Sequence, residues 1–263
     1  MSTLTAQGIF KQYPGHGAGD LPVLALKDMT FTVADNEFCS ILGHSGCGKT
    51  SMLTLIAGFE QPSAGLITVD GEKIGRPSWR RSMIFQDYAL FHWLNVADNI
   101  AFGLEMKGVA RAERQRIVAD YIGLVGLRGF EGRFPHQLSG VMRQRVSIAR
   151  ALAVDPDILL MDEPFAALDA QNRQLMQAET ARILATASKT VVLVTHSIEE
   201  AIMLSDRIIV MTRRPGTVKA NIEVKLPRPR EEDQPDVIEL KKYIRTLIHE
   251  ELEVETPLQA STS

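Results

Sequence analysis

The distribution of apolar and polar positions along this 263-residue chain predicts an α/β fold. Short apolar runs bounded by polar or turn-forming residues occur at residues 38–42, 82–86, 158–163, 191–196 and 208–211. Runs of this length are typical of strands that are buried on both faces, as in a parallel sheet. Shorter strands are predicted at residues 4–10, 24–33, 66–69 and 217–224, the last pairing near residues 208–211. Residues 51–57, which follow the first apolar run, predict a helix.

The segment from residue 87 to about residue 155 has a different pattern. A helix is predicted to begin near Val96, and a second to cover residues 112–125. The second helix has an apolar face formed by Ile117, Tyr121, Leu124 and Val125. Because no strand pattern is evident here, the segment is interpreted as an α-helical insertion subdomain at about residues 88–155.

The pattern changes again after residue 226. Residues 226–233 are charged and contain prolines, which is typical of a linker. An amphipathic helix that packs back on the domain is then predicted from Val237, Leu240, Ile244, Leu247 and Ile248. The expected division is one domain over residues 1–226, followed over residues 227–263 by a linker, a helix and a tail. Residues 257–263 are expected to be disordered.

Composition excludes several classes of protein. The chain is 45% hydrophobic and 23% charged, as in an ordinary globular protein, and its net charge of −3 gives no indication of nucleic-acid binding. No apolar run reaches the ~18 residues that span a bilayer, and the first residues do not resemble a secretion signal. Cys39 and Cys47 are the only cysteines and lack metal-ligand spacing, so we expect reduced thiols in the cytosol.

The strongest candidate site is the run Gly43-His44-Ser45-Gly46-Cys47-Gly48-Lys49-Thr50. It fits G-x-x-x-x-G-K-[ST], a phosphate-binding loop, and lies between a predicted strand and a predicted helix that begins at Ser51. The glycines let backbone N–H groups point at phosphate oxygens, and the helix N-terminus adds a partial positive charge. Lys49 is expected to reach the β- and γ-phosphates of a nucleotide, and the Thr50 hydroxyl to hold Mg²⁺.

Polar side chains end two of the other buried strands. Asp162 and Glu163 close the run at residues 158–163, and His196 closes the next. Asp162 is expected to lie beside the Mg²⁺ held by Thr50, and Glu163 is the natural general base for a water that attacks the γ-phosphate. A lone histidine is usually structural, but at this edge of the sheet His196 could hydrogen-bond the γ-phosphate and fix the attacking water.

Three further candidates carry weaker signals. Tyr13 could stack on a nucleotide base or simply cap a strand end. Gln86 ends a predicted strand at the ligand-facing edge of the sheet, where it could ligate Mg²⁺ or a water. Ser139, beside Gly140, could cap the following helix or help to bind an anion there.

Taken in order, these motifs resemble the ATPase subunit of an ATP-binding cassette (ABC) transporter over about residues 4–226. Residues 43–50 and 158–163 match the Walker A and Walker B motifs, and Leu138-Ser139-Gly140 begins the family signature. Gln86 matches the Q-loop glutamine, Ala167-Leu168-Asp169 the D-loop, His196 the switch histidine and Tyr13 the base-stacking aromatic. The resemblance implies a P-loop NTPase core with a parallel sheet, an antiparallel β subdomain and the helical insertion.

The resemblance also implies cofactors and partners. ATP and Mg²⁺ would be bound by the residues named above, with Thr50, Gln86 and Asp162 as the metal ligands and with Lys49, Glu163 and His196 as the catalytic residues. Two subunits, identical or different, would close head to tail, so that Ser139 and Gly140 contact the partner's nucleotide. The pair would drive an integral membrane permease from the cytoplasmic face of the membrane, served indirectly by a solute-binding protein, and would bind no nucleic acid.

One residue departs from the family pattern. The signature usually reads L-S-G-G, but the second glycine is Val141 here. A β-branched side chain threatens the close approach of this backbone to the γ-phosphate, and loss of one such donor can slow a reaction about a hundredfold. We therefore expect weakened hydrolysis, and a regulatory or hydrolysis-impaired subunit of a heterodimeric transporter is the alternative.

The subfamily follows from smaller features. Met142, residues 206–211 and residues 226–230 are similar to those of nitrate, sulfonate and taurine importer ATPases. An ABC ATPase of translation or DNA repair would usually carry two cassettes or a long coiled-coil insertion, and neither is evident. A P-loop kinase would not explain the signature or the switch histidine.

Overall fold

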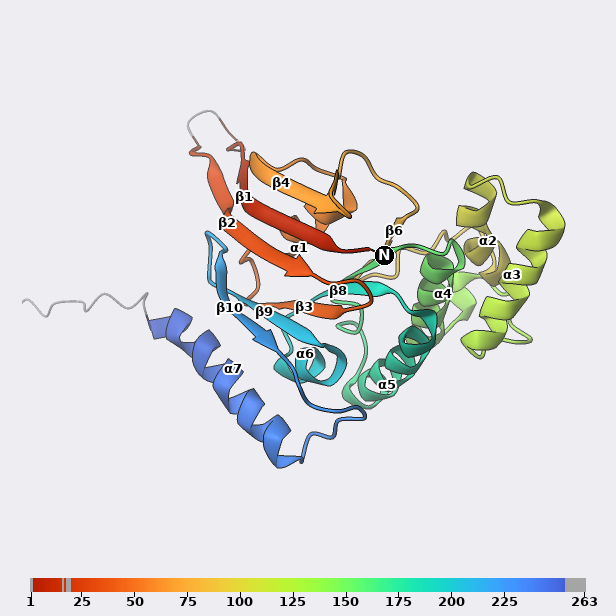
Figure 1. Ribbon diagram of the computed structural model, residues 1–263. Coiled ribbons are helices and arrows are strands. Elements are labelled where there is room, and N and C mark those ends of the chain that lie inside the picture. The colour runs from red at the N-terminus through yellow and green to blue at the C-terminus, as the bar shows by residue number, and fades with distance from the viewer. Residues whose placement is uncertain (1, 16, 18–19, 254–263) are drawn as a thin grey trace, which may run out of the picture.

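The computed structural model describes residues 2–15, 17 and 20–253 of the chain. Two sheets and a group of helices at one end form the molecule (Figure 1). The predicted disorder of residues 257–263 concerns a segment outside the described residues.

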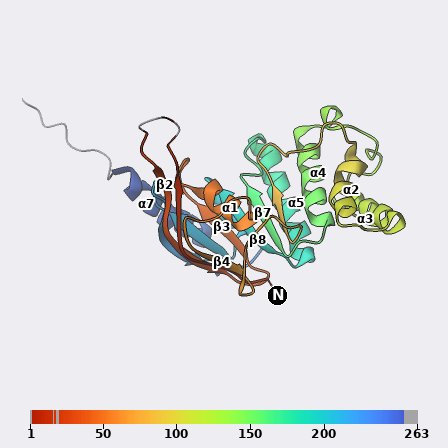
Figure 2. The same cartoon turned by 90° about the horizontal axis from the view of Figure 1, so that it is seen from above.

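An antiparallel sheet of four strands has the order β2-β1-β4-β5. Its strands are β1 (Leu4–Tyr13), β2 (Val23–Val33), β4 (Ala64–Val69) and β5 (Glu72–Lys73). Leu4 and Ala6 of β1 are fully buried, because alternate side chains of a strand point to the same face. The register shifts between Ala6 and Ile9, so the side chain of Ile9 is fully buried as well. This face packs on α1 (Lys49–Ala57), which lies between the two sheets in Figure 2.

The second sheet has six strands in the order β10-β9-β3-β8-β7-β6. They are β3 (Phe38–Leu42), β6 (Arg81–Ile84), β7 (Ile158–Asp162), β8 (Thr190–Thr195), β9 (Arg207–Met211) and β10 (Val218–Glu223). All neighbours run parallel except β10, which pairs antiparallel with β9. The residues of β3 and β8 are all buried, which explains why both strands read as continuous apolar runs.

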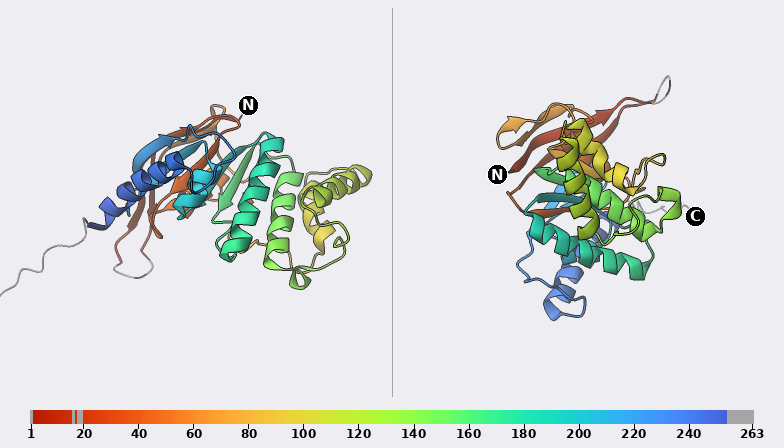
Figure 3. Two further views of the ribbon diagram at one scale, coloured as in Figure 1. Left: turned by 90° about the horizontal axis from the view of Figure 1, so that it is seen from below. Right: turned by 90° about the vertical axis from the view of Figure 1, so that its right-hand side faces the viewer.

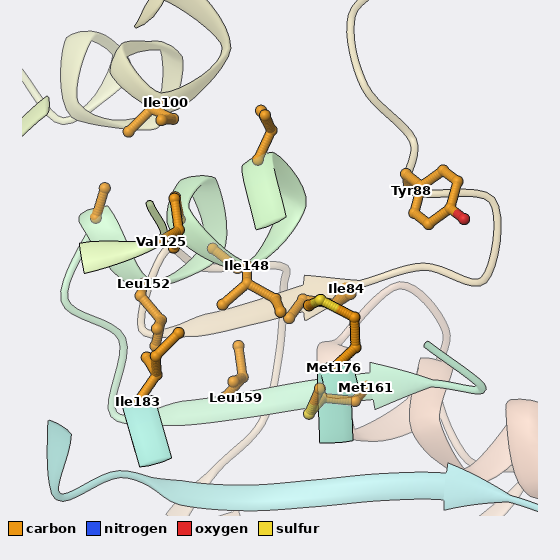
Figure 4. Close-up of a cluster of buried hydrophobic side chains, with 14 of the residues drawn as sticks. Ile84, Tyr88, Ile100, Val125, Ile148, Leu152, Leu159, Met161, Met176 and Ile183 are labelled. Atoms are coloured by element: carbon orange, nitrogen blue, oxygen red, sulfur yellow. The ribbon is translucent and has the colours of Figure 1, made fainter. Parts of the chain in front are cut away.

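The helices at one end are α2 (Val96–Met106), α3 (Arg111–Leu124) and α4 (Gly140–Ala153), with a 3₁₀ turn η1 (Pro135–Gln137) before α4. α5 (Ala170–Ala187), which follows β7 and precedes β8 in the chain, lies between these helices and the parallel sheet (Figure 3). A continuous hydrophobic cluster joins these parts. Figure 4 shows Ile100 of α2, Ile148 and Leu152 of α4, and Leu159 of β7 within it. The helices at residues 96–153 are therefore anchored to the same sheet that carries the phosphate loop.

At the other end of the parallel sheet, α6 (Ile198–Leu204) packs on β3 and β8, and α7 (Pro235–Glu253) packs on α6 and β9. Val237 and Ile244 of α7 are buried, and Leu240, Leu247 and Ile248 pack against the same cluster. The predicted amphipathic C-terminal helix is confirmed.

The structure corrects several boundaries. β1 continues to Tyr13, three residues past the predicted end, because Lys11 and Tyr13 pair with β2. β6 ends at Ile84, so Gln86 lies beyond the strand rather than at its last position. The most buried side chains of α3 are Val118 and Ile122, which the predicted apolar face omitted.

Candidate active site

The phosphate loop runs from the end of β3 to the start of α1, and two of its glycines have a left-handed backbone. Gly46 has φ +78° and Gly48 has φ +105°, conformations that residues with a side chain rarely adopt. A Cβ on Gly48 would also lie 2.7 Å from Cδ2 of Leu26 and 2.9 Å from the carbonyl oxygen of Ala25. Glycine at position 48 is therefore required both by the conformation and by the close approach of β2.

Cys47 contributes its backbone to the loop, while its side chain is buried in the core. A Cβ on Gly43 would lie only 2.8 Å from Sγ of Cys47, so the small residue at 43 makes room for the thiol. Burial raises the pKa of the Cys47 thiol, and that of Cys39 as well, although Lys49 opposes the shift at Cys47. Both cysteines are free, and neither is suited to act as a nucleophile.

Lys49 folds back over its own loop. Its ammonium donates to the carbonyl oxygens of Gly43 at 2.9 Å and His44 at 2.8 Å, and lies 3.9 Å from Oε1 of Glu163. The residue is only 5% exposed. The loop thus holds a buried positive charge at its centre, beside the N-terminus of α1, where phosphate binding is favoured.

A cavity of about 520 Å³ opens on this loop, within the range of small-ligand sites. The loop and first helical turn contribute Ser45, Gly46, Gly48, Lys49, Thr50 and Ser51 to its lining. The remaining lining residues are Tyr13, Pro14, Val23, Ala25, Gln86, Glu163 and Arg214. Tyr13 donates a 3.2 Å hydrogen bond from its hydroxyl to Oγ of Ser51, which fixes the ring at the cavity.

The acidic residues approach from the neighbouring strands. Asp162 ends β7, and its Oδ1 accepts a 3.3 Å hydrogen bond from the Thr50 hydroxyl. Burial raises the pKa of Asp162, and the charge of Glu163 adds to this, while Thr50 and Lys49 act in the opposite direction. An ion that neutralises this carboxylate would remove an unfavourable charge.

Glu163 and His196 meet at the carboxyl ends of β7 and β8. These strands are parallel neighbours, so their ends lie at the same edge of the sheet. Nδ1 of His196 is 2.9 Å from Oε2 of Glu163. Both residues line a second cavity of about 370 Å³ together with Gly43, His44, Ser45, Ile198 and Ile248. Because Glu163 and Ser45 line both cavities, the phosphate loop is accessible from two sides.

The residues present fit a Mg²⁺ ion. Mg²⁺ prefers oxygen ligands, often one or two carboxylates together with substrate phosphates. The Thr50 hydroxyl is 3.3 Å from the Asp162 carboxylate, and Gln86 lines the same cavity as Thr50, although Asp162 itself does not line it.

The signature residues lie elsewhere. Ser139 caps α4 and accepts from the backbone N–H of Met142 at 3.2 Å. In the described part of the chain, neither Ser139 nor Gly140 lines either cavity. The side chain of Val141 packs, half-buried, against the hydrophobic cluster of the helices.

Sequence reasoning missed four residues of the larger cavity: Pro14, Val23, Ala25 and Arg214. Three of them lie beside Tyr13 in sequence or on β2, so the pairing of β1 with β2 would have indicated them. Arg214 follows β9, whose carboxyl end lies at the same edge as those of β3 and β8. The position of Arg214 directly after this strand could have indicated that it lies near the site.

Comparisons with known proteins agree with this geometry. The family model described as ABC transporter matches residues 26–166. The taurine import ATP-binding protein TauB of Pelagibacter ubique is 44% identical over 92% of this chain and 90% of its own length. The bicarbonate transport ATP-binding protein CmpC of Synechocystis sp. is 45% identical over 84% of this chain but only 33% of its own length. A dimeric ATP-binding cassette in a post-hydrolysis state with ADP and Pi has a TM-score of 0.72 at 30% identity, covering 85% of this chain and 100% of its own.

The chain belongs to the ABC transporter family. Within that family it is an ATP-binding subunit with ATPase activity, as the resemblance of its motifs indicated. None of the helices in the described ranges is long and apolar enough to cross a membrane.

Proposed function

We propose that this subunit binds ATP with Mg²⁺ in the cavity on the phosphate loop and hydrolyses it to drive a membrane importer. The observation that carries the proposal is the position of Glu163, whose two carboxylate oxygens lie 3.9 Å from Lys49 and 2.9 Å from His196. A cation for phosphate, a carboxylate base and an orienting imidazole are thereby gathered at one edge of the parallel sheet.

Each residue has a distinct role in this proposal. Lys49 leaves the carbonyls of its own loop and contacts the β- and γ-phosphates. Glu163 accepts the proton of the attacking water, and His196 holds that carboxylate and contacts the γ-phosphate. Thr50, Asp162 and Gln86 hold Mg²⁺, which supplies electrostatic stabilisation of the phosphate charge.

Tyr13 and the loop backbone complete nucleotide binding. The ring of Tyr13 stacks on the base, a contact that contributes about 1–3 kcal/mol and tolerates different bases. The N–H groups of residues 43–51 donate hydrogen bonds to the phosphate oxygens, and the partial positive charge at the N-terminus of α1 adds to the attraction.

The second half of each site comes from another subunit. Ser139 and Gly140 lie at the N-terminus of α4, away from both cavities of their own chain within the described residues. A head-to-tail dimer would bring this helix terminus to the nucleotide of the partner. The dimeric state of the structural neighbour supports this arrangement.

The remaining partner is an integral membrane permease, which the subunit engages from the cytoplasmic face. Residues 1–226 act as the ATPase domain, with about residues 88–155 as the subdomain that transmits motion, and residues 227–263 as a C-terminal extension. Trp93, 73% exposed in the loop before α2, marks the docking surface. The names of the taurine and bicarbonate transport relatives support a small anion or organic solute such as nitrate, a sulfonate or taurine.

Purification from native membranes tests the proposal. We expect a polytopic permease to be recovered with the subunit and the complex to hydrolyse ATP in a Mg²⁺-dependent reaction. Recovery of ribosomes or DNA in place of a permease would contradict it. The alternative of a hydrolysis-impaired subunit is not favoured, because Lys49, Asp162, Glu163 and His196 are all present and gathered at the loop.

A further inference from the structure

The turn between β9 and β10 packs against the outer side of the phosphate loop. A Cβ on Gly216 would lie 2.2 Å from the carbonyl oxygen of Cys47, so the two backbones are in direct contact. The turn is also tied to β2, because Gly216 donates to Ala25 and accepts from Lys27, each at 2.9 Å. Within the turn, the Thr212 hydroxyl accepts from the N–H of Thr217 at 3.0 Å. These bonds give the turn a fixed position beneath the loop.

Arg214 projects from this turn onto the loop. Its Nε and Nη2 donate to the carbonyl oxygen of Gly46 at 3.1 and 2.9 Å. The residue is otherwise exposed and lines the larger cavity beside Gly46 and Lys49. A planar guanidinium that makes two bonds to one oxygen holds it in direction as well as in position.

Holding this carbonyl determines where the next N–H points. In a trans peptide the C=O and N–H point in opposite directions. The N–H of Cys47 therefore points away from Arg214 and donates a long hydrogen bond, 3.4 Å from N to O, to the carbonyl oxygen of His44. Lys49 places its ammonium on the same His44 oxygen. Gly46 has a left-handed backbone and no side chain, so this peptide is held by the long bond of the Cys47 N–H on one side and by the two bonds from Arg214 on the other.

We propose that Arg214 is a positioning residue of the nucleotide site. By holding the Gly46 carbonyl on the outer side of the loop, it keeps the N–H of Cys47 directed at the bound triphosphate. Its positive charge on the cavity wall adds to the attraction for that anion. This inference rests on the proposed function, since it assigns Arg214 to the same ATP site.

The test measures binding of Mg²⁺–ATP to the full chain carrying Arg214→Ala, Arg214→Met or Arg214→Lys. We expect about a tenfold higher Kd for the Ala and Met variants, in line with the loss of hydrogen bonds from a charged group. The Lys variant keeps the positive charge but cannot make both hydrogen bonds to the Gly46 carbonyl, so its Kd should lie between those of the wild type and the Ala variant. Arg182→Ala, which removes an exposed charge from α5, is the matched control and should bind ATP as the wild type does.

Further readouts separate positioning from a general effect on folding. KM for ATP should rise about as much as Kd, while kcat at saturating ATP changes less than threefold. The Tm without nucleotide should stay that of the wild type, and the increase in Tm on adding ATP should shrink. An unchanged Kd for Arg214→Ala would overturn the inference, as would a loss of affinity matched by a fall in Tm without nucleotide. If the wild type itself does not bind Mg²⁺–ATP, the proposed function fails instead.

Discussion

Nδ1 of His196 lies 2.9 Å from Oε2 of Glu163, and this hydrogen bond joins the carboxyl ends of β7 and β8. The backbone N–H of Glu163 donates to Val194 of β8 at 2.9 Å, so main chain and side chain are both tied to the same strand. The left-handed backbone of Glu163, with φ +43°, turns the chain out of β7 at this residue. The carboxylate is therefore held beside the phosphate loop before any nucleotide arrives.

Replacing Glu163 by Gln should separate ATP binding from hydrolysis. The amide keeps a hydrogen-bonding oxygen but cannot accept the proton of the attacking water, so kcat should fall at least ~100-fold. The Kd for ATP should stay within about threefold of the wild type, and ATP should trap a dimer visible by size-exclusion chromatography. Unchanged turnover would remove Glu163 as the base.

Restoring the missing glycine of the signature should raise activity. Val141→Gly would remove a β-branched side chain from the first turn of α4, and we expect kcat to rise by up to ~100-fold. The same change should lower Tm, because the half-buried Val141 packs on the helical cluster and glycine disfavours a helix. ATPase assays and thermal unfolding measure the two effects. A lower Tm without any gain in kcat would mean that valine is tolerated at this site.

Tyr13 should contribute to affinity through its ring rather than its hydroxyl. Tyr13→Ala should weaken ATP binding about 5- to 150-fold, and GTP binding by a similar factor, because stacking tolerates different bases. Tyr13→Phe keeps the ring and loses the hydroxyl with its 3.2 Å bond to Ser51, so it should remain within about threefold of the wild type. Fluorescence titration with both nucleotides distinguishes these cases. Equal losses for the two variants would point to the hydroxyl instead.

Asp162 should lower the stability of the nucleotide-free protein at neutral pH. Burial raises its pKa in the folded state, so folding favours the protonated carboxyl, and this contribution is lost as pH rises through the folded pKa. Asp162→Asn should therefore have a higher Tm than the wild type at pH 7 and no such advantage at a pH below the ordinary aspartate range. Thermal unfolding from about pH 2.5 to 8 in the absence of Mg²⁺ and ATP measures this.

The same variant should lose function while it gains stability. An amide is a poorer ligand for Mg²⁺ than a carboxylate, so the Mg²⁺ concentration for half-maximal ATPase should rise at least about tenfold. Thr50→Val, which removes the hydroxyl donor to Asp162, should likewise impair Mg²⁺ dependence but should not raise Tm at pH 7. A lower Tm for Asp162→Asn would show that its bonds outweigh the cost of burying its charge.

The buried strands were the part of the fold that the sequence defined best. β3 has the predicted bounds, β7 ends one residue earlier than predicted, and β8 begins and ends one residue earlier, because strands covered on both faces contain little but apolar residues. The end of β1 was harder to predict from the sequence, because the polar residues Lys11 and Gln12 belong to the strand only through their pairing with β2. The apolar face of α3 was incomplete because Val118 and Ile122 did not enter the predicted pattern.

The residues of the candidate site also differ in how far the sequence could predict them. Lys49, Glu163 and His196 could be placed together because a motif and two strand ends converge at one edge of a parallel sheet. Arg214 was missed, because an arginine in a turn normally indicates a solvent-exposed surface and its position after β9 was the only signal for the site. Its contact with Gly46 spans 168 positions and depends on the packing of β9 beside β3.

The tight contact of Gly48 with Ala25, described above, has a mechanical consequence. The backbone of the phosphate loop approaches β2 too closely to leave room for a side chain at residue 48, so a displacement of the antiparallel sheet would also move the loop. The helices at residues 96–153 are joined to the sheets by residues 85–95 and 154–157, and they share one continuous hydrophobic cluster with β7. A rotation of these helices would therefore have to bend both connections and rearrange that cluster.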